Sequence, residues 1–290
     1  MATVQLAELH VHLEGTIRRG TAAALAAEHG LPPPPPYEYS DLPGFLAIYG
    51  KVSRCMATSE DFERVIVEHG ESIATQSIAY TEVSFNPSLH PGRDWLEGVM
   101  RGRRRVKAEF GIEIGWLVEM VRGGSFADNE RAVDIAGTVE GAVGLGLVGD
   151  ESISAATLKY LVERARDAGL GFMPHAGQSG GPEVVLEAVE VLGATRIAHG
   201  VSAAEDEDVL RLLADRNVCL CVCPSSNARV GLRPRYRKLA DHDIPLTVNT
   251  DDPAMVPTTL EEELDVAETV HGLSRDALIA AAWKHRFTQA

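Results

Sequence analysis

The sequence of 290 residues is short of basic side chains. Its 27 Lys and Arg stand against 42 Asp and Glu, which gives a formal net charge of −15 at pH 7. Proteins that bind nucleic acid or anionic membranes need clusters of positive charge. The deficit argues against both kinds of partner. We expect a small-molecule substrate instead, either neutral or cationic.

Long hydrophobic runs and a cysteine framework are also missing. No apolar run approaches the ~18 residues of a membrane span, and the first eight residues do not resemble a signal peptide. Four cysteines, three of them at Cys219, Cys221 and Cys223, do not make a disulfide framework. We interpret these three as small apolar residues, with zinc thiolate ligation as the alternative. A soluble, cytoplasmic protein is expected.

Eight short apolar runs have the length of buried strands. They cover residues 6–11, 79–85, 113–121, 141–149, 169–174, 196–201, 218–223 and 244–249. Segments with helical periodicity lie between most of them, as over 158–165 and 185–192. Apolar strands that alternate with helices are typical of a parallel sheet covered by helices, and eight such units favour closure. The sequence therefore predicts an α/β fold, a single (β/α)8 TIM barrel over residues 1–290.

The first connection, from about residue 12 to residue 79, is longer than the others. It contains Pro32–Pro36, and five consecutive prolines form neither helix nor central strand. We expect a rigid surface spacer between small helices, and a ligand for a proline-binding partner domain is the alternative. No composition shift marks a second domain.

Histidine and aspartate side chains stand where four of the runs end. The reacting groups of a parallel barrel lie at the carboxyl ends of its strands. His10 and His12 are two residues apart, so that on a strand both rings face one side. His175, His199 and the pair Asp251–Asp252 end three further runs. Such a set predicts a metal site, whereas each residue alone is more often a core histidine, a turn or a helix cap.

Five motifs carry a family resemblance. These are Glu8–Gly15, Pro174–Gly177, Arg196–Val201, Cys223–Asn227 and Asn249–Pro253. Together, and in this order, they resemble the adenosine deaminase family of the amidohydrolase superfamily. The resemblance implies a metal-dependent hydrolase that replaces an amino group on a purine-type ring with oxygen from water.

By motif position, the resemblance implies one divalent ion, most simply Zn²⁺, on His10, His12, His175 and Asp251. A metal of this kind lowers the pKa of its bound water to about 7, which makes hydroxide available at neutral pH. The resemblance also implies that His199 orients this water and helps to remove its proton. His199, Asp251 and Gln178 occupy the catalytic positions.

The resemblance implies three contacts to the substrate. Asp252 accepts a hydrogen bond from the ring, and the backbone amide of Gly149 contacts the same ring. Glu14 matches an acidic position near the ribose hydroxyl. A purine nucleoside or a related heteroaromatic amine is therefore the expected substrate.

Gln178 departs from the family pattern, which continues Pro-His-Ala-Gly-Glu. The glutamate at this position protonates the ring nitrogen, and an amide can only donate a hydrogen bond there. General acid–base catalysis contributes typically ~10²–10⁴ in rate. Ser84 is a second departure, because the family often has a basic residue at its position.

Four interpretations of Gln178 stay open. The chain hydrolyses a different carbon–nitrogen bond that needs no acid, or it is a weakly active or inactive protein that binds ligand. Alternatively, Gln178 was introduced to trap substrate, or another carboxylate such as Glu151 or Glu183 supplies the proton. The sequence predicts a deaminase-like aminohydrolase with these alternatives.

Overall fold

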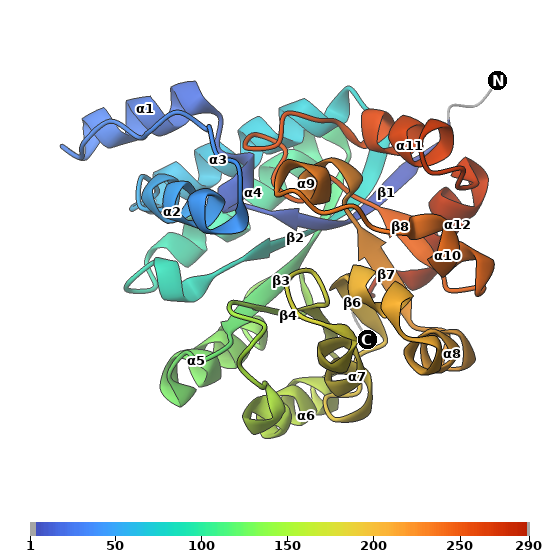
Figure 1. Cartoon of the computed structure of the whole chain (residues 1–290). Helices are drawn as coiled ribbons and strands as arrows, with labels where there is room; N and C mark the ends of the chain where they lie inside the picture. The colour runs from blue at the N-terminus through green and yellow to red at the C-terminus, as the bar shows by residue number, and fades with distance from the viewer. Residues whose placement is uncertain (1–3, 289–290) are drawn as a thin grey trace.

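A computed structural model describes residues 4–288 and shows eight parallel strands ringed by helices (Figure 1). Each strand pairs with the next one along the chain, in the order β1 to β8. The strands are β1 Leu6–His12, β2 Ile78–Phe85, β3 Glu113–Val121, β4 Ala142–Val148, β5 Gly171–Ala176, β6 Arg196–His199, β7 Cys219–Val222 and β8 Leu246–Val248. The prediction of a (β/α)8 barrel is confirmed.

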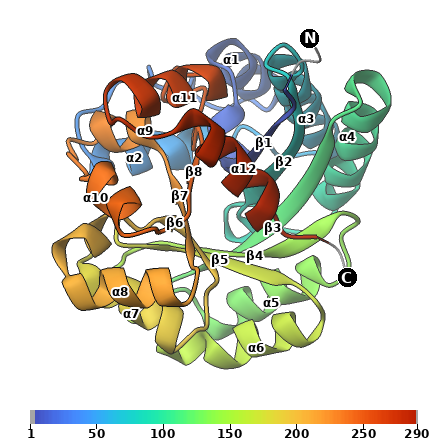
Figure 2. The same ribbon diagram turned by 90° about the vertical axis from the view of Figure 1, so that its right-hand side faces the viewer.

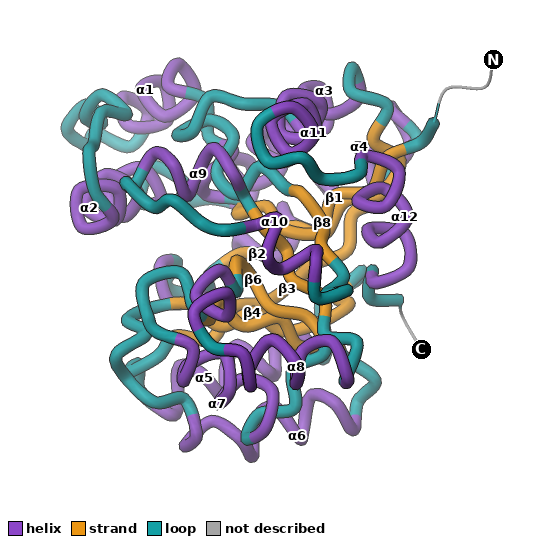
Figure 3. Tube along the Cα trace, turned by 45° about the vertical axis from the view of Figure 1, so that its right-hand side comes forward, coloured by secondary structure: helices purple, strands orange, loops and turns teal. Residues whose placement is uncertain are grey.

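Residues 4–288 contain twelve α-helices. They cover the outside of the sheet, as the purple tube in Figure 3 shows around the orange strands. They are α1 Arg19–Glu28, α2 Leu42–Ser53, α3 Ser59–Ala74, α4 Trp95–Phe110, α5 Phe126–Ala136, α6 Lys159–Asp167, α7 Pro182–Glu190, α8 Glu207–Asp215, α9 Pro224–Arg229, α10 Tyr236–Asp241, α11 Leu260–Thr269 and α12 Arg275–His285. Within residues 4–288, no helix has the length and apolarity to cross a membrane.

The long first connection holds α1, α2 and α3. Pro32–Pro36 lies between α1 and α2 and belongs to neither a helix nor a strand, as the prolines predict. The helices that flank these prolines, α1 and α2, have 10 and 12 residues, whereas α3 has 16 residues and packs along α4. A capping box between Thr58 and Asp61 starts α3, and its apolar face extends the core.

The barrel closes between β8 and β1 mainly through side chains. Asn249 Oδ1 accepts a hydrogen bond from the Leu9 amide at 2.8 Å, and Glu8 Oε1 accepts from the Thr250 amide at 2.8 Å. The only backbone bridge between these segments joins Val11 and Asp251, among the residues that the structure describes. The buried polar residues of the Asn249–Pro253 motif thus hold the seam of the barrel.

The amino-terminal end of the barrel, which we call the floor, contains a buried ion pair. Arg196 of β6 pairs with Glu82 of β2, and both side chains are almost fully buried. Figure 2 shows α12 leading to the C-terminus. The segment after α12 contacts this ion pair. Phe287 stacks on the guanidinium at 3.7 Å, and its amide donates to Glu82 Oε1 at 2.6 Å. The floor is therefore closed by packing and by hydrogen bonds.

Cys219, Cys221 and Cys223 are buried free thiols. Cys221 packs with Leu9, Leu117 and other apolar residues inside the barrel. No cysteine belongs to a group of potential metal ligands in the described part of the chain. Their interpretation as small apolar residues agrees with this packing.

Candidate active site

Three imidazoles and one carboxylate converge at the carboxyl ends of β1, β5 and β8. The Nε2 atoms of His10, His12 and His175 lie 3.2–3.3 Å from one another. Asp251 Oδ1 lies 3.3 Å from Nε2 of both His10 and His12. The structure thus brings together the four residues that the sequence predicts as metal ligands.

The second nitrogen of each ring shows why this cluster fits a cation. His10 Nδ1 faces the Cys221 carbonyl at 3.4 Å, His175 Nδ1 faces the Leu147 carbonyl at 3.2 Å, and His12 Nδ1 faces Ser84 Oγ at 2.9 Å. The two carbonyls can only accept, and the Ser84 hydroxyl also lies within donating distance of the Val11 carbonyl, at 3.3 Å. Each ring therefore carries its proton on Nδ1.

The three Nε2 lone pairs then point at one another with no proton to share. Such an arrangement is unfavourable in a buried site unless a cation lies between the lone pairs. Tetrahedral zinc with Zn–N bonds of about 2.0–2.1 Å separates its ligands by roughly 3.3 Å. The observed spacing of 3.2–3.3 Å matches that value. His10, His12, His175 and Asp251 could hold a divalent ion.

His199 and Asp251 both adopt a left-handed backbone, with φ of 64° and 65°. This conformation is costly for residues other than glycine, and strain of this kind gathers at functional sites. Asp251 is held there by β1, because its amide donates to the His10 carbonyl and its carbonyl accepts from the His12 amide. The strained backbone turns the Asp251 carboxylate toward the histidines.

His199 lies beside the cluster, with Nε2 at 3.8 Å from Asp251 Oδ2. Ser226 donates to the same carboxylate oxygen at 2.6 Å and so fixes its direction. Burial lowers the pKa of His199 to about 3. The ring is therefore neutral and has a nitrogen free to accept a proton.

Asp252 is buried next to the cluster, and its Oδ1 atom makes no hydrogen bond. Burial and the charge of Asp251 raise the pKa of Asp252 well above its usual range. A Cβ atom on Gly15 would lie 1.9 Å from Asp252 Oδ1, so only glycine allows this approach. The predicted ring-binding carboxylate thus has an oxygen available for a ligand.

Gly149 and Glu14 differ in how accessible they are to a ligand. Gly149 is exposed at the end of β4, where its backbone is open to a ligand. Glu14 is fully buried, and Oε1 accepts from the Asn86 amide and from His90 Nε2, each at 3.0 Å. Its Oε2 accepts from the Tyr49 hydroxyl at 3.2 Å. A ribose hydroxyl would have to displace one of these donors from Glu14.

Gln178 follows His175 by three residues and is half-buried. Its Nε2 donates to Asn227 Oδ1 at 3.4 Å, and Asn227 Nδ2 donates to the Tyr236 hydroxyl at 2.8 Å. The amide is therefore tied to α9 through Asn227, whose side chain also lies beside His199.

Glu151, one of the two alternative acids, is engaged by the same loop. Its carboxylate accepts from the amides of Gly177 at 2.8 Å, Gln178 at 3.2 Å and Gly180 at 2.7 Å. Both oxygens of the carboxylate are therefore occupied by backbone donors. Glu183 lies exposed in the first turn of α7. Glu151 therefore shapes the loop around Gln178, and it is not a free acid.

The sequence did not single out Glu119, which the structure places beside the metal ligands. It is buried near the end of β3, and its Oε1 lies 2.9 Å from His12 Nδ1. An acidic residue within the apolar stretch that follows Glu113 in this strand was the available signal.

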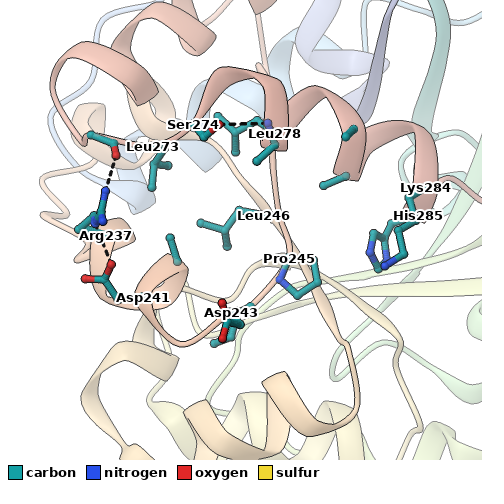
Figure 4. Close-up of a pocket in the computed structure, with 16 residues that line it drawn as sticks. Arg237, Asp241, Asp243, Pro245, Leu246, Leu273, Ser274, Leu278, Lys284 and His285 are labelled. Atoms are coloured by element: carbon teal, nitrogen blue, oxygen red, sulfur yellow. Dashed lines mark hydrogen bonds and ion pairs between the residues drawn. The ribbon is translucent and has the colours of Figure 1, made fainter.

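A cavity of about 550 Å³ lies elsewhere, on the outer wall between α10, β8 and α12 (Figure 4). Arg237 on its edge donates to Asp241 at 2.8 Å and to the Gly272 carbonyl at 2.7 Å. Ser274 caps α12 by accepting from the Ala277 amide. These polar groups already have partners within the protein, so we assign the chemistry to the histidine cluster.

A parallel barrel with histidines and an aspartate at the carboxyl ends of its strands defines the class of amidohydrolases. The family profile described as adenosine deaminase matches residues 5–285. The chain therefore belongs to the adenosine deaminase family, as its motifs predicted. It is a deaminase-like aminohydrolase that acts on carbon–nitrogen bonds.

Similar proteins include an aminodeoxyfutalosine deaminase of Acidothermus cellulolyticus, 34% identical over 90% of this chain and 81% of the relative. An adenine deaminase of Bordetella parapertussis is 31% identical over 93% of this chain and 92% of the relative. The crystal structure of an adenine deaminase from Arthrobacter aurescens superposes with a TM-score of 0.91 at 26% identity, covering 99% and 94% of the two chains.

Proposed function

We propose that the protein binds one divalent ion, most simply Zn²⁺, through His10, His12, His175 and Asp251, and hydrolytically deaminates a purine-type amine. The convergence of three bare Nε2 atoms and one carboxylate carries this proposal. When bound, such an ion lowers the pKa of a water and supplies a nucleophile at neutral pH. A structurally similar amidohydrolase, 22% identical with a TM-score of 0.90, has bound Zn.

The other residues of the rim supply proton handling and substrate binding. His199 is buried beside the ligands, with Nε2 3.8 Å from Asp251 Oδ2, and from this position it passes a proton from water to the leaving amine. Asp252 offers its free Oδ1 to a ring N–H, and the Gly149 backbone contacts the ring from β4. Glu14 accepts hydrogen bonds from Tyr49 and His90, and it contacts a sugar hydroxyl only if one of its donors is displaced.

The substrate proposal is a purine base, nucleoside or related heteroaromatic amine. Relatives are named for deamination of adenine and of aminodeoxyfutalosine. Structures in the same fold include an N6-methyl-AMP deaminase of Arabidopsis thaliana, 22% identical with a TM-score of 0.86. Neutral and cationic amines suit the acidic chain better than phosphorylated ones, since its formal charge is −15.

The test combines metal analysis with an assay of ammonia release. We expect one zinc per chain in purified protein, and turnover of at least one amine from a panel of adenine, adenosine and their derivatives. Protein that contains no divalent ion and takes none up after chelation contradicts the metal proposal. Zinc-loaded protein without turnover of any amine contradicts the deaminase proposal.

A second candidate is a ligand-binding protein with little turnover. Gln178 favours it, because an amide cannot donate a proton and Glu151 is held by three backbone amides. The two candidates differ in one comparison. Tight binding of a purine by zinc-loaded native protein, with turnover only in Gln178→Glu, identifies a binder that has lost the chemistry.

A further inference from the structure

The proton supply on one side of the site is incomplete. Gln178 presents an amide that donates to Asn227, and the nearby Glu151 carboxylate accepts from three backbone amides. Arg122, the cation at the end of β3, directs its Nη atoms to the carbonyls of His175 and Ile153. None of these three side chains is an acid free to protonate a substrate.

Water addition to an aromatic amine has a definite proton requirement. When oxygen bonds to the carbon that bears the amine, the electron pair of the ring C=N bond moves to the ring nitrogen. A neutral ring becomes negative there unless an acid supplies a proton at the same time. A ring whose nitrogen already carries an alkyl group starts with a positive charge, and the same step leaves it neutral.

The rest of the site is rich in buried carboxyl groups. Asp252 Oδ1 is buried and makes no hydrogen bond, and Glu119 Oε1 lies 2.9 Å from His12 Nδ1. A buried carboxylate oxygen without a partner is costly, and a cationic ligand relieves that cost. The electrostatics and the missing acid therefore favour the same kind of substrate.

We propose that the substrate is a heteroaromatic amine whose ring nitrogen, adjacent to the amine-bearing carbon, is alkylated, so that the ring carries a fixed positive charge. This inference rests on the proposed deaminase function. Gln178 then completes the wall of the site without donating a proton.

The reaction balances without an added acid. Water oxygen bonds to the carbon, the C=N pair neutralises the ring nitrogen, and His199 carries a water proton to the amine. The carbon–amine bond breaks as the carbonyl forms, and the second water proton leaves with the amine. A cationic amine and water thus give a neutral N-alkyl lactam and ammonium.

The experiment compares 1-methyladenosine with adenosine, and 1-methyladenine with adenine, at pH 7. Zinc-loaded native protein, Gln178→Glu and Gln178→Met are assayed for ammonium release. In native protein, kcat/KM for the methylated compound should exceed that for its partner by at least ~10², since the missing acid contributes typically ~10²–10⁴. Gln178→Glu should raise turnover of the unmethylated compounds by a similar factor, whereas Gln178→Met should keep the native preference.

Equal turnover of both compounds by native protein, or a preference for the unmethylated one, overturns the proposal and leaves the deaminase function in place. Turnover that appears only in Gln178→Glu also overturns it and identifies a binder. Failure of all three zinc-loaded proteins on all four compounds rejects the deaminase function together with the inference. Zinc content and circular dichroism of each variant show that the comparison is made on folded, loaded protein.

Discussion

The two ends of the barrel treat buried charge in opposite ways. On the floor, Arg196 and Glu82 pair with each other and also bond to the His285 carbonyl and the Phe287 amide. At the rim, Asp252 Oδ1 and His199 Nδ1 are buried and make no hydrogen bond. The difference shows where the chain uses charge for stability and where it leaves charge for an ion and a substrate.

Removal of a metal ligand should give the largest loss of zinc and of deamination rate. This loss should depend on the rim of the barrel and not on its floor. We expect His175→Ala to lose stoichiometric zinc and at least about 10³ in deamination rate, because an ion of this kind contributes several kcal/mol to the transition state. Metal analysis and the ammonia assay measure this loss. His242→Ala, a change at a histidine that bonds Glu207 on the surface, is the matched control and should keep both. Full zinc content in His175→Ala would mean that the assignment is wrong.

Disruption of the Arg196–Glu82 ion pair on the floor should lower the free energy of unfolding without loss of the metal. Arg196→Met leaves Glu82 buried without its partner, and we expect a loss of about 3–5 kcal/mol in the free energy of unfolding. Denaturant titration measures the loss, and zinc per folded chain should not change. Adding Glu82→Leu should restore much of the stability, because an apolar pair avoids the unpaired charge. If Arg196→Met alone is as stable as native protein, the ion pair does not stabilise the floor as proposed.

Glu119 offers a smaller change at the rim. Its carboxylate lies 2.9 Å from His12 Nδ1, so Glu119→Gln removes a charge that favours metal binding by that ring. We expect zinc affinity, measured by chelator competition, to fall by about 10–100-fold, as for other residues that orient metal ligands. Ser84→Ala, which removes the hydrogen bond to the same nitrogen, is the comparison. Unchanged affinity in both variants would show that His12 needs neither residue.

The smallest effect concerns pH and the floor. Burial, together with Lys284 and Arg196, lowers the pKa of His285. The unfolded chain keeps the ordinary value near 6.5, so it binds more protons than the folded chain at pH values just below that. Stability should therefore fall as the pH drops below about 6.5. His285→Leu should flatten this slope in denaturant titrations of the two proteins, and identical slopes would count against it.

The sequence predicted the barrel well because each strand and helix has its own local pattern. The eight apolar runs match the eight strands, although β6, β7 and β8 are shorter than their runs. The chain leaves the ladder early there, as at Asn249, whose side chain bonds to β1 in place of the backbone. The clustering of His10, His12, His175 and Asp251 also followed from their places at strand ends.

Local sequence patterns could not predict the contacts between loops that lie far apart along the chain. The engagement of Glu151 by the amides around Gln178 depends on how two loops fold against each other. The same holds for Glu14, whose oxygens are taken by Tyr49, Asn86 and His90 from two other segments. Spacing along the chain gives no signal for such partners.

The seam between β8 and β1 has a consequence for the order of folding. Leu9 and Asn249, which join across it, are 240 positions apart, and His10 and Asp251 lie next to them. Contacts of such long range form late, because closing a long loop is slow. A chain emerging from the ribosome cannot assemble its four ligands until β8 has left the exit tunnel. Zinc uptake would therefore report on completed folding, and truncated or stalled chains would stay without metal.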